Sequence, residues 1–208
     1  MSLPAELRVS PSLVMAMAFA AGALPFANVA AGLCAGVDLR HVGDGTVSGT
    51  GLHRVAGFTP LAAAGILDVG KGALGPLLAG PGRPYLGAVA ASLAIAGHDW
   101  SPLLGGAGGR GVAPALVATM VLAPEATAVL LGGLVAGRLS RQTALVTLGS
   151  LAALTPLLWR RRGTIGLATA VAVAGPMIAK RLTGSRSPGP DRRRALRSRL
   201  LFDRDPRT

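Results

Sequence analysis

Long apolar runs with few or no charged residues alternate with short polar, glycine-rich segments along this chain. The first run, residues 12–37, contains no charged residue and exceeds the ~20 residues that an α-helix needs to cross a bilayer. Later runs cover residues 55–79, 85–96, 112–137, 143–159 and 163–179. Pro124 and Glu125 interrupt the run 112–137. The pattern predicts an all-α, multi-spanning membrane protein with six transmembrane helices, or seven if Pro124 divides that run.

The first run has two other interpretations. With Arg8 before it, it could be a signal peptide that ends near residues 30–36, or a lipoprotein signal that ends at Cys34. A first transmembrane helix is the better prediction, because the run is long for a signal peptide and further apolar runs follow. Cys34 is the single cysteine, so an intrachain disulfide and a cysteine-based metal site are both excluded.

Composition agrees with a membrane protein. Half of the residues are hydrophobic, the mean hydropathy is +0.52 and 14% are charged, against roughly 25% in an average soluble domain. The formal net charge is +12, and the segment 180–208 contributes ten basic and three acidic residues to it. We therefore expect a single transmembrane domain over 1–183 and a basic, disordered cytoplasmic tail over 184–208.

The basic tail is expected to meet membrane lipids. Anionic headgroups of the cytoplasmic leaflet attract arginine and lysine clusters. Nucleic acid is not expected, because 3% aromatic residues supply no stacking surface. The residues expected at the headgroups are Lys180, Arg181, Arg186, Arg192, Arg193, Arg194, Arg197 and Arg199.

Loop charge predicts the orientation. The loops 38–54 and 97–111, the turn 138–141 and the tail are all basic, and seven helices with the N-terminus outside put all four in the cytoplasm. This arrangement leaves Arg160–Arg162 outside, against the rule, whereas six helices put these arginines inside and split the other basic loops between the two faces. We expect a multi-pass protein of the plasma membrane with a cytoplasmic C-terminal tail.

Three polar segments, residues 43–54, 68–72 and 97–111, hold the candidate functional residues. Ionisable residues within a span are unfavourable unless they serve a function, so Asp68 and Lys71 are candidates. Their spacing puts them on one helix face, where a simple intrahelical ion pair is the alternative. The glycines of the third segment allow several backbone N–H groups to point at one anion, which indicates an anion site at a membrane face.

Three motifs occur in order in these segments: GVDLRHVGDGTVSGTGLHRVAG, DVGKG and GHDWSPLLGGAGGRGVA. At these separations they resemble the PlsY family of acyl-phosphate:glycerol-3-phosphate acyltransferases, whose corresponding motifs are G-S-G-N-x-G-x-T-N-x-x-R-x-x-G, D-x-x-K-G, and G-H-x-F-P with G-G-K-G-V-A. The similarity runs from about Leu24 to Ala136, with a weaker match up to Gly184. It implies transfer of a fatty acyl group from acyl phosphate to glycerol 3-phosphate, giving lysophosphatidate for phospholipid biosynthesis, with no metal or other cofactor.

The resemblance also implies a set of site residues. Two phosphates must be held together, so Arg54, Lys71 and Arg110 offset their repulsion. His98 orients or deprotonates the attacking hydroxyl. Asp38, His53 and Asp99 are expected to be structural or surface residues. The substrate-binding residues implied are Gly43, Gly45, Thr46, Ser48, Thr50, Asp68, Gly108, Gly109, Gly111 and Ser140.

The chain departs from the family motifs at several positions. Asp44 stands where the family has serine, Arg110 where it has lysine, and Met177 or Ile178 where it has a C-terminal asparagine. Asp44 brings a carboxylate into a phosphate loop, which weakens binding unless it pairs with Arg40 or Arg54. Alternative hypotheses are therefore an inactive or re-tuned relative that binds a phosphate-bearing lipid or metabolite, a small transporter, or a polybasic membrane anchor for a partner protein.

Overall fold

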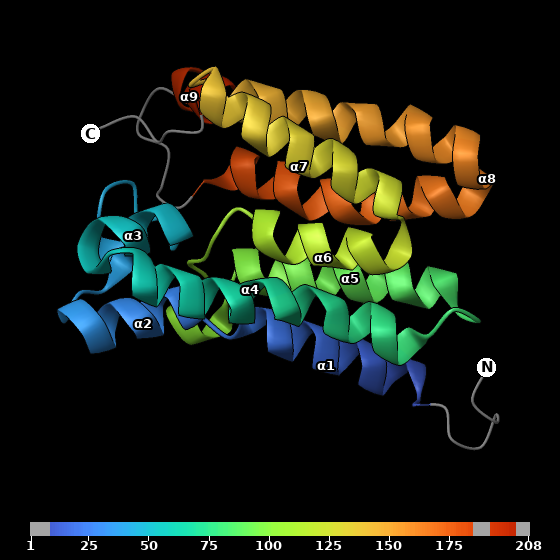
Figure 1. The fold of residues 1–208 in the computed structure, drawn as a ribbon, viewed down its shortest axis with the longest axis horizontal. Helices are drawn as coiled ribbons and strands as arrows, with labels where there is room; N and C mark the ends of the chain where they lie inside the picture. The colour runs from blue at the N-terminus through green and yellow to red at the C-terminus, as the bar shows by residue number, and fades with distance from the viewer. Residues whose placement is uncertain (1–8, 185–191, 203–208) are drawn as a thin grey trace.

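The computed structural model describes residues 9–184 and 192–202, and these residues form helices and no strand. Together with the similarity reported below, this confirms the predicted all-α class. The helices are α1 (Pro11–Ala23), α2 (Phe26–Ala35), α3 (Gly49–Ala56), α4 (Phe58–Ala79), α5 (Pro84–Asp99), α6 (Val112–Leu122), α7 (Pro124–Leu139), α8 (Thr143–Thr183) and α9 (Arg192–Phe202), with 3-10 turns η2 (Leu39–His41) and η3 (Pro102–Leu104) (Figure 1).

Breaks in the helices fall at proline and glycine. The run 112–137 is two helices, because α6 ends before Pro124 and α7 begins there. Helix α8 is also two helical arms, which reverse direction at Gly163, where φ is 60° and ψ is −137° (Figure 1). Positive φ without a steric penalty is available to glycine alone, so Gly163 makes this reversal possible. Among the residues that the structure describes, three helical segments are long and apolar enough to cross a membrane, namely Pro11–Ala35, Phe58–Ala79 and Thr143–Thr183, and α6 is a shorter apolar helix.

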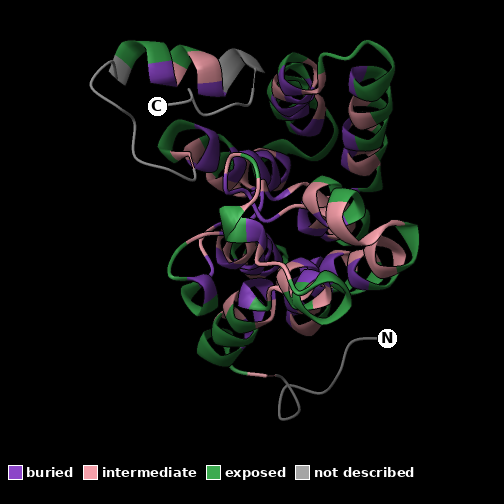
Figure 2. Ribbon diagram, turned by 90° about the vertical axis from the view of Figure 1, so that its left-hand side faces the viewer, coloured by how far each residue is buried: buried purple, intermediate pink, exposed green. Residues whose placement is uncertain are grey.

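The outer surface carries apolar side chains where a soluble protein has charges. Leu33 is 83% exposed, Ile66 74% and Val171 59%. Figure 2 shows exposed positions on the outer faces of the helices and buried positions between them. Exposed aliphatic side chains on most helices are the expected surface of a bundle that lipid surrounds.

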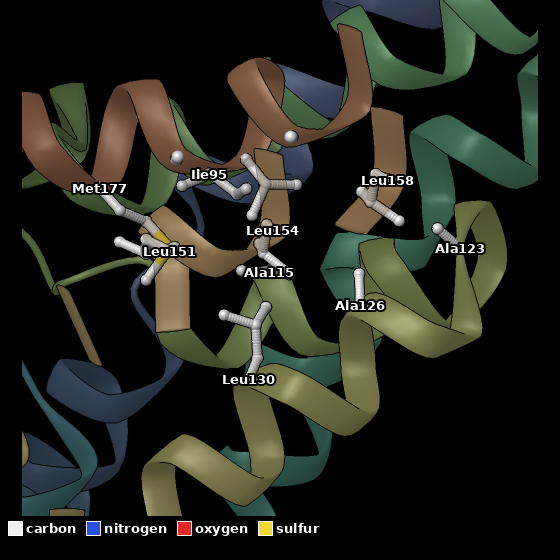
Figure 3. Packing of buried hydrophobic residues seen from close by; sticks show 12 residues of the cluster. Ile95, Ala115, Ala123, Ala126, Leu130, Leu151, Leu154, Leu158 and Met177 are labelled. Atoms are coloured by element: carbon white, nitrogen blue, oxygen red, sulfur yellow. The ribbon is translucent and has the colours of Figure 1, made fainter. Parts of the chain in front are cut away.

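Small residues fill the interior. The largest apolar cluster draws buried residues from α5, α6, α7 and both arms of α8, and Figure 3 shows them converging. Close helix contacts depend on glycine: a Cβ at Gly22 in α1 would overlap the Ala94 carbonyl of α5, and a Cβ at Gly72 in α4 would overlap the Pro114 carbonyl of α6. Packing of this kind is typical of membrane helices, which gain little from hydrophobic burial against each other.

The basic segments meet at one end of the bundle. The N–H of Val47 donates to the Gly108 carbonyl at 2.9 Å, which joins the two glycine-rich loops. Arg138 at the end of α7 donates to Thr50 Oγ1 in α3 at 3.3 Å. At the opposite end, Arg162 forms an ion pair with Glu125 at 2.6 Å and also donates to the Leu122 carbonyl at 2.9 Å.

The C-terminal residues differ from the expectation of a disordered, lipid-facing tail. Lys180 and Arg181 are buried, at 1% and 4% exposure, and Arg181 donates to the Ala144 carbonyl at 2.8 Å. Arg199 of helix α9 is also buried, and it donates to the carbonyls of Leu182 and Thr183 at 3.1 and 2.8 Å. These contacts satisfy carbonyls at the end of α8 and hold α9 against it. Arg193, Arg194 and Arg197 are exposed, whereas Arg186 lies outside the described residues.

Candidate active site

The break between α1 and α2 is the floor of the candidate site. Pro25 interrupts the first apolar run, and Ala23 and Leu24 therefore lack the usual helical partners for their carbonyls. Ser101 Oγ donates to the Ala23 carbonyl at 2.6 Å, and Lys71 Nζ donates to the Leu24 carbonyl at 2.9 Å. Two polar segments distant in sequence thus converge on this break.

Asp68, Lys71 and His98 form one buried group. Lys71 Nζ lies 2.7 Å from Asp68 Oδ1 on the same face of α4, as their spacing predicts. His98 Nδ1, from the end of α5, lies 3.9 Å from the same oxygen. The Lys71 and Asp68 side chains are 3% and 11% exposed, and that of His98 is 13% exposed. The carboxylate therefore sits between a cation and an imidazole at the end of the bundle where the loops meet.

Two glycines of the third motif pack directly against His98. Gly109 N–H donates to the His98 carbonyl at 3.0 Å, and a Cβ at Gly109 would overlap Nε2 of the imidazole. A Cβ at Gly108 would overlap the His98 carbonyl oxygen. Asp68 and His98 line one small cavity together with Gly108, Gly109 and residues of the α1–α2 break. The close approach of backbone to the imidazole explains why glycine is present at both positions.

Arg110 forms an ion pair with Asp44 of the first glycine-rich loop, residues 38–54. Its Nη2 lies 3.2 Å from Asp44 Oδ2, and the other carboxylate oxygen of Asp44 accepts the Thr46 N–H at 3.0 Å. The Arg110 side chain is 11% exposed and that of Asp44 is 35% exposed. Arg40 and Arg54 are the partners that the sequence offers for Asp44, and the loop instead folds the carboxylate onto Arg110.

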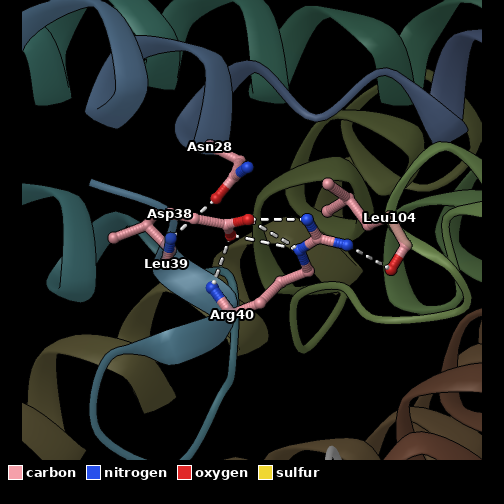
Figure 4. A network of polar contacts seen from close by, with 5 residues as sticks. All are labelled: Asn28, Asp38, Leu39, Arg40 and Leu104. Carbon is pink, nitrogen blue, oxygen red and sulfur yellow. Dashed lines mark hydrogen bonds and ion pairs between the residues drawn. The ribbon is translucent and has the colours of Figure 1, made fainter. Parts of the chain in front are cut away.

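Arg40 is engaged elsewhere in the same loop, as Figure 4 shows. Its guanidinium forms an ion pair with Asp38, with Nη2 at 2.6 Å from Oδ2, and Nη1 donates to the Leu104 carbonyl at 3.4 Å. Hydrogen bonds from Arg40 lower the pKa of Asp38 to about 2, so both groups are charged at neutral pH. Asn28 Oδ1 accepts the Leu39 N–H at 2.8 Å, which ties this turn to α2. Asp38 is a structural residue, as expected.

Asp99 and Lys180 are two buried ionisable residues that the sequence does not place in the site. Asp99 is fully buried, and neither carboxylate oxygen accepts a hydrogen bond within the described part of the chain. The charges of Lys180, Arg110 and Lys71 act on it. The Lys180 ammonium lies 5.5 Å from the centroid of the Trp100 ring, a cation–π distance. The available signal is that Lys71 and Lys180 are the two lysines of the chain, the first inside an apolar run and the second directly after one.

Other predicted residues have local structural roles. Arg54 is exposed on α3 and makes no hydrogen bond or ion pair with the residues that the structure describes. Ser48 caps α3 by accepting the Gly51 N–H at 3.1 Å, and Ser140 caps α7. Gly43 and Gly45 adopt positive φ in the first loop, and Gly111 does so immediately before α6. Arg54 and Ser140 remain on the surface. Arg110 directly follows Gly109 in the third motif, so it lies next to the site. The predicted residues that the structure brings together are Asp68, Lys71, His98, Gly108 and Gly109.

The arrangement suits chemistry on an anionic substrate. An imidazole and glycine-rich backbone line one cavity, and the buried Lys71 lies against Asp68 of its lining. These are the kinds of group that bind phosphate and move a proton. Within residues 9–184 and 192–202, no group of three or more His, Cys, Asp or Glu side chains could hold a metal ion.

Comparison with known proteins gives consistent results. A sequence profile described as glycerol-3-phosphate acyltransferase matches residues 12–182. Glycerol-3-phosphate acyltransferase 2 of Moorella thermoacetica is 40% identical over 116 residues, which cover 55% of this chain and 59% of that protein. Glycerol-3-phosphate acyltransferase of Myxococcus xanthus is 35% identical over 145 residues, covering 68% of this chain and 74% of that protein. This chain therefore spans about three fifths of the Moorella protein and about three quarters of the Myxococcus protein.

Solved structures share the fold. The crystal structure of PlsY, an integral membrane glycerol 3-phosphate acyltransferase, in its glycerol 3-phosphate form has a TM-score of 0.76 and 25% identity, with 96% of each chain covered. Its lysophosphatidic acid form has a TM-score of 0.73 at 22% identity and supports the fold alone. The helical bundle described above is thus that of an integral membrane protein.

Proposed function

This chain belongs to the glycerol-3-phosphate acyltransferase family, and we propose that it transfers a fatty acyl group from acyl phosphate to the sn-1 hydroxyl of glycerol 3-phosphate. The products are lysophosphatidate and inorganic phosphate, which places the reaction at the entry to phospholipid synthesis. The observation that carries the proposal is the cavity shared by Asp68, His98, Gly108 and Gly109, with Lys71 beside it.

The proposed chemistry needs no enzyme nucleophile, because an acyl phosphate is already activated. The hydroxyl oxygen attacks the acyl carbonyl carbon, the bond from that carbon to the phosphate oxygen breaks, and the hydroxyl proton leaves. His98 is the group that orients the hydroxyl or accepts its proton. Lys71 and Arg110 offset the negative charge of the two phosphates, and the N–H groups of the glycine loops donate to phosphate oxygens. Arg54, which is exposed, would join them when substrate binds.

We place the protein in the plasma membrane, with the site and the C-terminal tail in the cytoplasm. The proposed orientation has seven crossings, formed by the α1–α2 pair, α4, α5, α6, α7 and the two arms of α8. The remaining conflict, Arg160–Arg162 on the outer side, is eased because Arg162 is paired with Glu125. Reporter fusions after residue 208 and within 160–163 test this orientation, since the first should respond as cytoplasmic and the second as external.

The exposed Arg193, Arg194 and Arg197 of α9 are proposed to contact anionic lipid headgroups.

Purified full-length protein supplied with acyl phosphate and glycerol 3-phosphate should release inorganic phosphate and form lysophosphatidate. Lys71→Ala and Arg110→Ala should each abolish this release, whereas Arg83→Ala, at the opposite end of the bundle, should retain it. Wild-type protein that gives no turnover above background would refute the proposal.

The Asp44–Arg110 ion pair favours one second candidate, a relative that binds a phosphate-bearing metabolite without turnover. Calorimetric binding of glycerol 3-phosphate in the absence of turnover identifies that case. Binding together with turnover excludes it.

A further inference from the structure

Asp44 is an acidic residue in the glycine-rich loop 38–54, which binds a substrate phosphate in the proposed reaction. One carboxylate oxygen lies 3.2 Å from Arg110 Nη2, while the other accepts the Thr46 N–H at 3.0 Å. An Asp side chain that accepts a backbone N–H two residues further on forms an Asx turn, which restricts its orientation. The first loop therefore fixes this carboxylate on the guanidinium of Arg110.

The other carboxylate of this loop, Asp38, already has a partner within the loop. Asp38 and Arg40 form their own ion pair, and Arg40 also reaches the Leu104 carbonyl. Asp44 is therefore the carboxylate of residues 38–54 that contacts a residue of the third motif. Its contact is with the side chain that the proposed function assigns to phosphate.

We propose that Asp44 is a specificity-determining residue, an internal carboxylate that competes with the ligand's phosphate group for Arg110. The inference rests on the proposed function, because it takes Arg110 as a phosphate-binding residue. A phosphate at Arg110 brings negative charge next to the Asp44 carboxylate, and like charges a few ångströms apart repel. The carboxylate must therefore leave the guanidinium before a phosphate dianion binds there at full strength.

Competition between Asp44 and the ligand's phosphate lowers the affinity for the ligand, and it favours ligands that carry negative charge over neutral ones. When the binding-competent state is a fraction of the population, the measured dissociation constant rises by the inverse of that fraction. For a partly exposed, hydrogen-bonded ion pair, this amounts to about threefold to tenfold. A dianionic phosphate displaces the carboxylate, whereas a neutral polyol such as glycerol has no charge with which to do so.

Kinetics of the full-length enzyme in detergent test the proposal. Asp44→Asn removes the charge and keeps an oxygen that accepts the Thr46 N–H, and Asp44→Ser is the second variant. In both, the KM of the substrate whose phosphate binds at Arg110 should fall about threefold to tenfold, with kcat within about twofold of wild type. Varying glycerol 3-phosphate and acyl phosphate separately shows which phosphate Arg110 holds. The effect of added glycerol on the rate should be the same in both variants as in wild type.

Asp38→Asn is the matched control, because it removes an equal charge from the same loop at a carboxylate paired with Arg40. It should leave both KM values unchanged. An unchanged or raised KM for both substrates in Asp44→Asn and Asp44→Ser overturns the proposal while leaving the proposed function intact. If wild-type protein gives no turnover, the proposed function fails, and calorimetric titration with glycerol 3-phosphate still decides the inference: tighter binding to Asp44→Asn supports it, and equal or weaker binding overturns it.

Discussion

Lys71 Nζ lies 2.7 Å from Asp68 Oδ1, and both side chains are buried on the same face of α4. Removal of one member of a buried ion pair leaves an uncompensated charge, whereas removal of both does not. The two roles suggested for this pair, structural or functional, can therefore be separated by combining substitutions.

Lys71→Met and Asp68→Asn should each lower the free energy of unfolding by about 3–5 kcal/mol, because each leaves a buried charge alone. Each should also reduce phosphate release on the order of 100-fold, the loss typical of removing one pre-positioned charge from an active site. The double variant should recover most of the stability and none of the activity. Recovery of activity in the double variant would show that the pair has only a structural role.

Gly109→Ala should reduce kcat nearly as much as His98→Ala does. A Cβ at Gly109 would overlap Nε2 of His98, and the Gly109 backbone needs no positive φ, so displacement of the imidazole is the expected effect. The control is Gly132→Ala in α7, where nothing lies within 4 Å of an added Cβ. Steady-state phosphate release measures both variants, and a Gly109→Ala enzyme with wild-type kcat would contradict the placement of His98.

Gly72→Ala should destabilise the bundle, because an added Cβ would overlap the Pro114 carbonyl where α4 packs against α6. Forced overpacking of this kind typically lowers stability by about 1–3 kcal/mol. Gly70→Ala on the same helix meets nothing within 4 Å and should leave the Tm unchanged or raise it. Thermal unfolding in one detergent compares the two, and equal Tm values would contradict the close α4–α6 contact.

Arg199→Ala should release α9 from α8. Two hydrogen bonds from the guanidinium, to the carbonyls of Leu182 and Thr183, are lost. Hydrogen bonds from charged groups are worth about 1.5–3 kcal/mol each, so the detached population should rise at least about tenfold. Limited trypsin digestion measures this population. Arg197→Ala, at an exposed position of the same helix, should digest at the wild-type rate, and equal rates for both variants would contradict the docking of α9.

The apolar runs predicted most of the bundle, because lipid imposes long, uncharged helices and proline and glycine mark their ends. The division at Pro124 was one of two alternatives, and the structure contains the divided form. The spacing of Asp68 and Lys71 predicted their ion pair because both lie on one helix. Local patterns of this kind depend on helix geometry alone.

Long-range pairings could not be predicted in the same way. The partner of Asp44 is Arg110, 66 residues away, and no local rule selects it over Arg40 or Arg54. Lys180 was assigned to lipid headgroups on net charge alone, yet it is buried over the Trp100 ring. The Lys180 contact depends on how α8 returns across the bundle after Gly163, which the sequence pattern does not specify.

The break at Pro25 also constrains the order in which the protein is made. The carbonyls of Ala23 and Leu24 are satisfied by side chains 78 and 47 residues later in the chain, on Ser101 and Lys71. Synthesis proceeds from the N-terminus, so the first span is translated before either of these partners. The two carbonyls can therefore gain these partners only after Lys71 and Ser101 have been translated, and the polar floor of the site is completed no earlier than the third motif.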